Sequence, residues 1–399
     1  MISNGNGIFS RETLAGYDRA VLDHAVVTLV GCGAAGNNIA LNLALAGVGE
    51  LRLIDFDHVD PSNVTRSPLF HRDRLQGSAV RHKAREVALG ALACSHAPKP
   101  VVRFAVAPVE SLGLGVFQDS GVIVAAVDSL SVRAYLADAS RLLGIPLVEI
   151  GFSGSEGHVS LFSNQVADGP CWRCLHPNVS HGAYSCSLHA RQILSEGRVP
   201  ATQPLAAALG GITAEATIQA LHRRFPLDSK AFHLDVRGGQ SRLLAMTADA
   251  RCPGEHRHLG TIRDIDIGPD DTALCLLEAI GAEITDPILH LPHPMVLEVP
   301  CAKCGSPVRV GKPAWSVKEA PSCSTCPETP RSGRGLLIET WIARANPSAR
   351  MALRKLGICV GAVVEVEDGR SGQVRALRVK GTIDTLFVSK QRKNGTATI

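Results

Sequence analysis

The stretch that decides the fold covers residues 25–55 and reads AVVTLVGCGAAGNNIALNLALAGVGELRLID. It opens with an apolar, β-prone run that ends at Gly31. An alanine- and leucine-rich segment follows over residues 36–46, and a second apolar run closes the stretch at residues 51–55. A strand, a glycine turn, a helix and a second strand make a β-turn-α-β unit. We therefore expect a Rossmann-like fold to begin here.

The same alternation of strands and helices continues along the chain. Its segments are helical at 81–93 and 131–143 and strand-like at 101–106, 122–127 and 146–150. Such alternation is typical of a doubly wound, mainly parallel α/β sheet. A spaced cysteine quartet and a β-rich tail over residues 361–386 follow later. We expect a nucleotide-binding domain at residues 1–264 and a smaller zinc-ribbon and β-rich domain at residues 265–399.

Length and composition set the broad class. The 399 residues are enough for two or three domains, with 45% hydrophobic and 20% charged residues, as in ordinary soluble proteins. Basic and acidic residues nearly balance at 41 and 37, and aromatics make up 4%, which argues against nucleic acid or membranes as partners. The chain has neither a run of about 18 apolar residues nor a secretory signal pattern at its N-terminus. These features favour a cytoplasmic protein.

The glycine turn indicates a nucleotide site. Gly31, Gly33 and Gly36 lie where a phosphate-binding turn belongs, between a strand and a helix N-terminus. Asp55 ends the next strand, where a carboxylate can accept hydrogen bonds from ribose hydroxyls. On these features alone, an NAD(P)- or FAD-dependent oxidoreductase is an open alternative.

The residues after Asp55 carry a more specific signal. Residues 55–66 read DFDHVDPSNVTR; Lys83 comes later, and Asp128 follows a later strand. In this order the chain resembles the ThiF/MoeB/ubiquitin-activating superfamily, including the Gly-Val-Gly at residues 47–49. The resemblance covers residues 8–260, and Ser67 departs from it, because the superfamily commonly has glutamine there.

The resemblance implies a homodimeric enzyme that uses ATP and Mg²⁺ to adenylate a carboxylate. It assigns Asp55 to the ribose, Asn63, Arg66 and Lys83 to the phosphates and Asp128 to Mg²⁺, and it includes Asp57 in the nucleotide site. Arg11 is the candidate that reaches across the dimer to the γ-phosphate. The implied partner is a ubiquitin-like or sulfur-carrier protein, activated at its C-terminal carboxylate. A ribosomal peptide as substrate is a close alternative, and a catalytically idle zinc-containing scaffold is a more distant one.

Cysteine pairs predict two structural zinc sites, because disulfides are rare in the cytosol. The resemblance places the first site at Cys171, Cys174 and Cys252, while Cys252 as an unliganded thiol stays open. His256 or His258 supplies the fourth ligand, and His256 is favoured because it lies nearer the usual spacing. The second site has zinc-ribbon spacing. Its ligands are Cys301, Cys304, Cys323 and Cys326. Four protein ligands close a site, so neither zinc is expected to be catalytic.

Two roles stay open from the sequence. Cys186 lies in the segment that, in some relatives, carries the cysteine that accepts the acyl group as a thioester, and it could equally be a packed thiol. The C-terminal domain could bind the partner or a downstream carrier, or could serve stability or dimerisation.

Overall fold

A computed structural model gives the structure of the protein. It describes residues 7–70, 80–165, 169–179, 202–281, 283–301, 303–317, 322–326 and 337–391. The chain forms two compact units: unit 1 contains residues 1–109, 117–258 and 384–399, and unit 2 contains residues 110–116 and 259–383. The units therefore divide a few residues before the expected boundary at 264/265. The last part of the chain returns to unit 1 instead of staying with the C-terminal domain.

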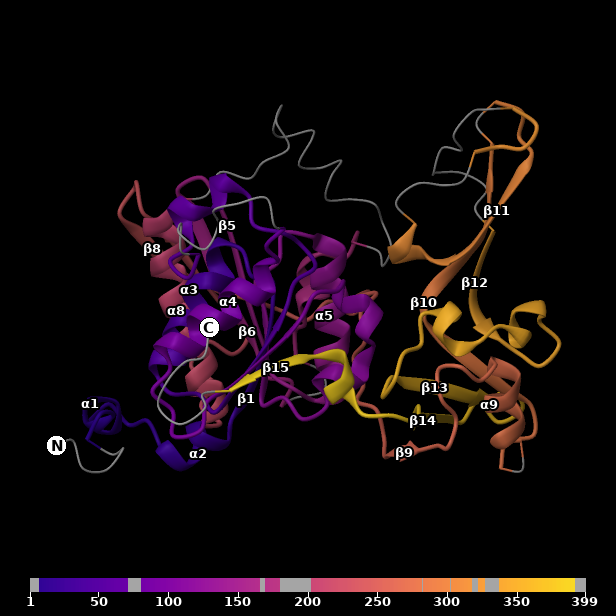
Figure 1. Ribbon diagram of the computed structural model, residues 1–399, viewed down its shortest axis with the longest axis horizontal. Helices are drawn as coiled ribbons and strands as arrows, with labels where there is room; N and C mark the ends of the chain where they lie inside the picture. The colour runs from indigo at the N-terminus through magenta and orange to yellow at the C-terminus, as the bar shows by residue number, and fades with distance from the viewer. Residues whose placement is uncertain are drawn as a thin grey trace. The chain divides into compact units, whose positions relative to one another are not determined.

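Unit 1 is built on a nine-stranded sheet with the strand order β15-β3-β2-β1-β4-β5-β6-β7-β8 (Figure 1). The strands are β1 (Val26–Val30), β2 (Glu50–Ile54), β3 (Val101–Ala105), β4 (Val122–Ala125), β5 (Leu147–Ser153), β6 (Glu156–Phe162), β7 (Lys230–Asp235), β8 (Gln240–Ala245) and β15 (Val388–Gln391). Neighbours from β3 to β5 are parallel, whereas β6, β7, β8 and β15 pair antiparallel. The predicted doubly wound, mainly parallel α/β sheet is confirmed.

Helices cover both faces of this sheet. The helices of unit 1 are α1 (Ser10–Leu14), α2 (Arg19–His24), α3 (Ala34–Leu45), α4 (Lys83–Cys94), α5 (Leu130–Leu143), α6 (Trp172–Leu175) and α8 (Gln203–Leu221), with the 3-10 turn η1 (Pro61–Arg66). The 3-10 turns η3 (Val109–Leu112) and η4 (Leu114–Phe117) fall almost entirely in unit 2, and η8 (Ile383–Leu386) falls where the chain returns to unit 1. Crossovers between parallel strands are right-handed, so α3 and α4 lie on the face opposite to α5. Burial on both faces explains why the central strands are almost continuously apolar.

The packing of α3 against α8 depends on small residues. A side chain at Gly210 of α8 would place its Cβ 2.7 Å from the Cβ of Asn38 on α3, so the helices can approach only because that position is glycine. Asn38 and Gln203 exchange amide hydrogen bonds of 3.2 and 3.0 Å across the same contact. Figure 1 shows α3, α4 and α8 grouped together and α5 apart from them.

Unit 2 contains a six-stranded sheet with the order β11-β10-β13-β14-β9, and β12 pairs with β10. Its elements are β9 (Ile262–Asp264), α9 (Ala273–Ala279), β10 (Pro287–Pro300), β11 (Pro307–Pro313), η5 (Ala314–Ser316), β12 (Leu337–Ile342), η6 (Pro347–Arg350), η7 (Leu353–Leu356), β13 (Val363–Asp368) and β14 (Val374–Arg378). One apolar core joins α9 to the sheet, including Leu277, Leu289 and Ile342, each fully buried. Among the helices that the structure describes, none is long and apolar enough to cross a membrane.

Candidate functional site

The glycine turn joins β1 to α3 at the carboxyl ends of the parallel strands. Gly31 has a φ of 95°, and a side chain there would place its Cβ 2.3 Å from the carbonyl oxygen of Ala126. A Cβ at Gly36 would lie 1.9 Å from the carbonyl oxygen of Gly31. By contrast, a Cβ at Gly33 would meet no atom within 4 Å. Gly31 and Gly36 therefore permit the tight turn, and Gly33 leaves open space at the first turn of α3, where backbone N–H groups attract anions.

Asp55 ties this turn to the loop after β2. Its two carboxylate oxygens accept hydrogen bonds from the backbone N–H of Cys32, at 2.7 Å, and of Asp57, at 2.8 Å. Burial raises the pKa of Asp55, and these two bonds oppose the rise. Each carboxylate oxygen has a second lone pair, so a ribose hydroxyl can still donate to Asp55.

Lys83 and Asp57 form an ion pair beside Asp55. The Lys83 Nζ lies 2.6 Å from an Asp57 oxygen, and the Lys83 backbone N–H donates to the Asp57 carbonyl at 2.9 Å. Burial acts to raise the pKa of Asp57, but the hydrogen bond and charge of Lys83 hold that pKa below its usual value. A bound phosphate would compete with Asp57 for the same cation.

Asn63 and Arg66 lie on η1, directly after this loop. The Asn63 side-chain oxygen accepts a 3.0 Å bond from the N–H of Asp60 and so caps η1, which leaves the amide nitrogen as the donor for a ligand. Arg66 ends η1 and is half-buried, and Ser67 after it is buried. Asn37, fully buried on α3, accepts a 2.7 Å bond from the N–H of Leu69 and so fixes this segment against α3.

The remaining predicted residues differ in where they lie. Asp128 is exposed between β4 and α5, and the parallel register of β1 and β4 brings it to the same sheet edge as the glycine turn. Arg11 is exposed on α1, which Figure 1 shows at the periphery of unit 1. Cys186 lies outside the described residues. The structure thus assembles the loop after β2 and Lys83 into one group beside the glycine turn, and it leaves Arg11 separate.

Sequence reasoning missed a buried polar cluster at the same edge. Glu149 on β5 is 1% exposed and forms an ion pair with Arg133 of α5, and His158 on β6 lies 3.0 Å from its other oxygen. Burial, and then the charge of Arg133, lower the pKa of His158 to about 4. Glu149 pairs in register with Ala125, the last residue of β4, so the cluster lies close to the strand end that Asp128 follows. The sequence does carry a signal for this cluster, because Glu149 interrupts the apolar run at residues 146–150 that predicts a strand.

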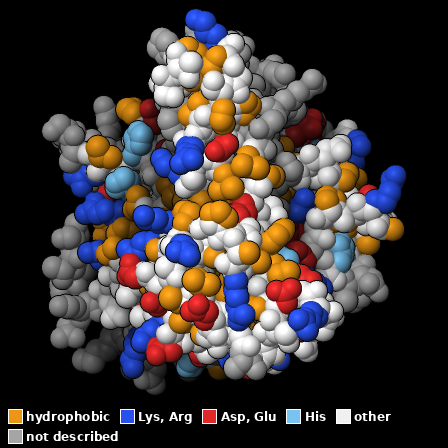
Figure 2. Space-filling view, turned by 90° about the vertical axis from the view of Figure 1, so that its right-hand side faces the viewer, with side chains coloured by type: hydrophobic (Ala, Val, Ile, Leu, Met, Phe, Trp, Pro, Cys, Tyr) orange, Lys and Arg blue, Asp and Glu red, His pale blue; other side chains and the backbone are white. Residues whose placement is uncertain are grey.

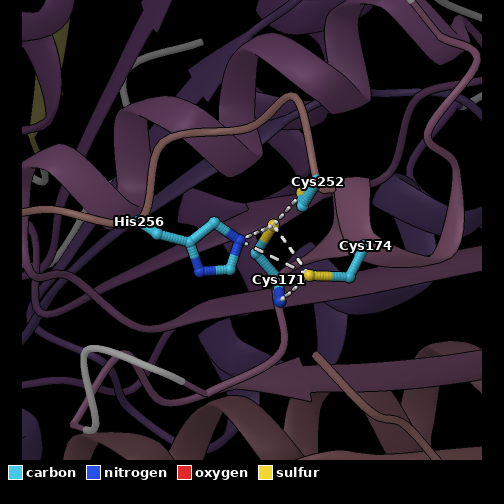
Figure 3. A group of neighbouring side chains, drawn as sticks. All are labelled: Cys171, Cys174, Cys252 and His256. Atoms are coloured by element: carbon cyan, nitrogen blue, oxygen red, sulfur yellow. Dashed lines mark hydrogen bonds between the residues drawn. The ribbon is translucent and has the colours of Figure 1, made fainter. Parts of the chain in front are cut away.

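The first cysteine set comes together as a four-residue cluster (Figure 3). The Cys171 sulfur lies 3.8 Å from that of Cys174, 3.6 Å from that of Cys252 and 3.5 Å from His256 Nε2. With Zn–S bonds of about 2.3 Å, sulfurs of a tetrahedral site lie about 3.8 Å apart, so the donor set fits a zinc ion. The separations exclude disulfide bonds, which require about 2.05 Å. His258 lies elsewhere, with its ring next to Gly144.

Asp138 on α5 supports this cluster, and sequence reasoning did not identify it. One of its oxygens accepts a 2.7 Å bond from Arg173, which lies between Cys171 and Cys174. The other accepts a 3.0 Å bond from the N–H of Glu255, the residue before His256. One buried carboxylate therefore holds both halves of the cluster, as outer-shell partners commonly do at metal sites.

The second cysteine set also comes together, within unit 2. Cys301 and Cys326 sulfurs lie 3.4 Å apart, and Cys304 lies 3.6 Å from both Cys323 and Cys326. The four sulfurs all lie within 4.8 Å of one another, so this set also could hold a metal ion.

Comparisons with known proteins agree with this geometry. The chain is 32% identical over 180 residues to the adenylyltransferase and sulfurtransferase MOCS3 of Bos taurus, covering 42% of this chain and 38% of that protein. It is 25% identical over 233 residues to MOCS3 of Caenorhabditis briggsae, covering 58% of this chain and 54% of that protein. The chain therefore spans about a third to a half of the length of these relatives.

Solved structures share the fold of unit 1. The structure of E. coli MccB with ATP matches with a TM-score of 0.52 at 18% identity, over 62% of this chain and 74% of that one. At this identity the likeness shows the fold alone. The model of the ThiF family matches residues 11–254, which include the glycine turn, the loop after β2, Lys83 and Asp128. More than half of the chain is matched, and the chain belongs to the ThiF family.

Proposed function

We propose that this protein uses ATP and Mg²⁺ to adenylate the C-terminal carboxylate of a ubiquitin-like or sulfur-carrier protein. The observation that carries the proposal is the group formed by Asp55, Asp57 and Lys83 beside an open glycine turn. It presents N–H donors and a cation at one sheet edge, which suits a triphosphate. Relatives described as adenylyltransferases support this activity.

The reaction follows from where these residues lie. The partner's carboxylate oxygen attacks the α-phosphorus of ATP, the bond from that phosphorus to the bridging oxygen breaks, and pyrophosphate leaves with the bond's electrons. Lys83 and Arg66 stabilise the negative charge that develops on the phosphates. Asp128 would hold Mg²⁺, which supplies further charge neutralisation when bound. The carboxyl group becomes an acyl-adenylate, ready for attack by a thiol or a sulfur donor.

The oxidoreductase alternative explains fewer of the site residues than adenylation does. Hydride transfer has no need of Arg66 and Lys83 at the loop after β2, or of an exposed Asp128 at the end of β4. These residues have a direct use in phosphate and metal binding. We therefore place the dinucleotide-dependent alternative second.

The proposed active form is a homodimer. Arg11 is exposed on α1, and it would reach the γ-phosphate bound by the partner subunit. Support for dimerisation comes from the edge of the sheet in unit 1, where Leu243 and Leu244 of β8 are 59% and 49% exposed. An apolar edge strand of this kind is normally covered. Sedimentation of a Leu243→Ser, Leu244→Ser variant tests this, and an unchanged dimer would show that the contact lies elsewhere.

ATP–pyrophosphate exchange tests the activity. Purified protein with Mg²⁺ and candidate carrier proteins or peptides should show exchange with one partner class. Lys83→Ala and Asp128→Ala should abolish it, while Lys99→Ala, at an exposed lysine outside the site, should not. Absence of exchange with every candidate, together with tight NAD binding, would restore the oxidoreductase.

A further inference from the structure

A buried ion pair of unit 1 takes no part in the adenylation proposed above. Over most of the face drawn in Figure 2, acidic, basic and hydrophobic side chains lie intermixed, as on an ordinary protein surface. The side chains of Arg133 and Glu149, by contrast, are only 12% and 1% exposed. Burying two charges costs free energy that their attraction often does not recover. A buried pair beside a binding site is therefore a candidate for a functional role.

This ion pair fixes the tautomer of His158. Glu149 is paired with Arg133 and can only accept hydrogen bonds, so His158 Nε2, 3.0 Å from its second oxygen, carries the ring proton. In a neutral ring Nδ1 then holds an unshared electron pair, and it has no hydrogen-bond partner among the described residues. The side chain is 39% exposed, so a ligand can reach the ring.

The strand pairing leaves room for this ring. Gly151 of β5 lies opposite His158 of β6, and a Cβ at Gly151 would lie 2.6 Å from His158 Cε1. Because position 151 has no side chain, the ring can lie across it and reach Glu149, two residues earlier on β5. Three positions are thus adapted to one imidazole.

The surroundings keep the ring neutral at neutral pH. Burial, and then the charge of Arg133, lower the pKa of His158 to about 4. Charged or titratable groups face it from the described elements around it: Arg133 of α5, Glu149 of β5, His233 of β7 and His176 after α6, with Glu156 on the same face of its own strand. A neutral ring with a free electron pair can accept a proton.

The register of the sheet places this ring beside the nucleotide site. Val30 of β1 pairs with Ala125 of β4, and Ala125 pairs with Glu149 of β5. Glu149 is therefore level with the last residue before the glycine turn, and Gly151, opposite His158, lies two residues nearer the carboxyl edge. Neighbouring strands are about 4.8 Å apart, so β6 lies about 10 Å from β4.

The direction of attack on ATP favours this side of the edge for the acyl group. Arg66 and Lys83, proposed to bind the phosphates, follow β2, whereas β5 and β6 lie on the other side of β1. In an in-line displacement the carboxylate enters opposite the departing pyrophosphate. The acyl group would then extend over β4 and β5 towards His158.

We propose that His158 accepts the proton of the thiol that attacks the acyl-adenylate, with Glu149 and Arg133 as positioning residues. The thiol sulfur bonds to the acyl carbon, its proton passes to His158 Nδ1, and AMP leaves with the electrons of the carbon–oxygen bond. His158 then releases the proton to water. Adenylation itself needs no such acceptor, because the attacking carboxylate carries no proton. The inference rests on the proposed function and adds the step that follows it.

The two half-reactions separate this role from a structural one. With the partner that supports ATP–pyrophosphate exchange, the exchange rate should be the same in His158→Gln as in the unmodified protein. Acyl transfer to β-mercaptoethanol at neutral pH should fall about a hundredfold, the lower end of what a general base contributes. His233→Gln is the matched control and should change neither rate, because His233 lies opposite His158 and pairs with Glu156, which is 60% exposed.

The pH profile gives a readout that a folding defect would not produce. Between about pH 6 and 8 the thiol and the neutral ring both predominate, so acyl transfer by the unmodified protein should hardly change. Without the acceptor only the thiolate reacts, so transfer by His158→Gln should rise about tenfold per pH unit. Added imidazole should restore part of the rate in His158→Ala.

A second measurement needs no ATP. Nitrogen-15 NMR of histidine-labelled protein, assigned with His158→Gln, should show a neutral His158 ring at neutral pH with its proton on Nε2. A charged ring or a proton on Nδ1 would overturn the proposal.

Two kinetic results would also overturn it: equal transfer rates in His158→Gln and His233→Gln, or a loss of exchange in His158→Gln as large as its loss of transfer. Each of these results leaves adenylation by the unmodified protein intact. Absence of exchange from the unmodified protein with every candidate partner would instead refute adenylation, and this step with it.

Discussion

Replacing Asp138 tests whether one carboxylate holds the first cysteine cluster together. Asp138→Ala removes the 2.7 Å bond from Arg173 and the 3.0 Å bond from the Glu255 N–H in a buried setting. Breaking a buried ion pair by removing one partner costs about 3–5 kcal/mol. Asp138→Asn keeps an acceptor for the Glu255 N–H and loses the charge, so we expect a cost of about 1–3 kcal/mol.

The assay follows unfolding in urea through Trp172, which is buried in α6 between two of the cluster's cysteines. Trp315→Phe and Trp341→Phe leave Trp172 as the single tryptophan of the chain, so the signal reports on this site. Asp384→Ala is the control, because its ion pair with Arg103 is largely exposed and is worth at most about 1 kcal/mol. Equal stabilities of Asp138→Ala and Asp384→Ala would refute the supporting role.

Three further predictions concern metal, pH and acyl transfer. Elemental analysis should find two zinc ions per chain in the unmodified protein and one in Cys252→Ser. Cys94→Ser, outside both clusters, should keep two. Two zinc ions in Cys252→Ser would rule out the first site. His158 has a pKa of about 4 in the folded protein, below its unfolded value of about 6.5, so its contribution to stability is full above pH 6.5 and is lost as the pH falls towards 4. His158→Gln should flatten the pH dependence of the unfolding free energy over this window, and an unchanged slope would show that folding does not lower the pKa of His158. If Cys186 accepts the acyl group, mass spectrometry of the non-reduced protein should find a thiol-labile adduct with the partner. The adduct should be absent from Cys186→Ser. An adduct that persists in this variant would show that another residue is the acceptor.

Much of this architecture could be predicted because its signals are local. The apolar runs and the glycine turn fix the parallel strands, and the Cys-x-x-Cys pairs indicate both clusters. The role of Glu149 could not be predicted from the sequence. It depends on Arg133 and His158, which lie on neighbouring elements that only the folded sheet brings together. Ligand chemistry does not separate His256 from His258, since both offer an imidazole on one loop; only the spacing favoured His256, the histidine that lies in the cluster.

The end of the chain also lay beyond sequence reasoning. The domain expected at residues 265–399 includes β15, but β15 pairs antiparallel with β3 in unit 1. Strand pairing between segments so distant in sequence depends on which sheet edge is open, and residue preferences do not encode that.

Adenylation predicts which phosphate of ATP reaches the partner, and parallel reactions with α- and γ-labelled ATP measure this directly. With the partner identified by exchange, the α-label should appear on its C-terminal carboxylate and the γ-label in pyrophosphate. Both transfers should be lost in Lys83→Ala. Release of the γ-label as inorganic phosphate, with no α-label on the partner, would contradict adenylation.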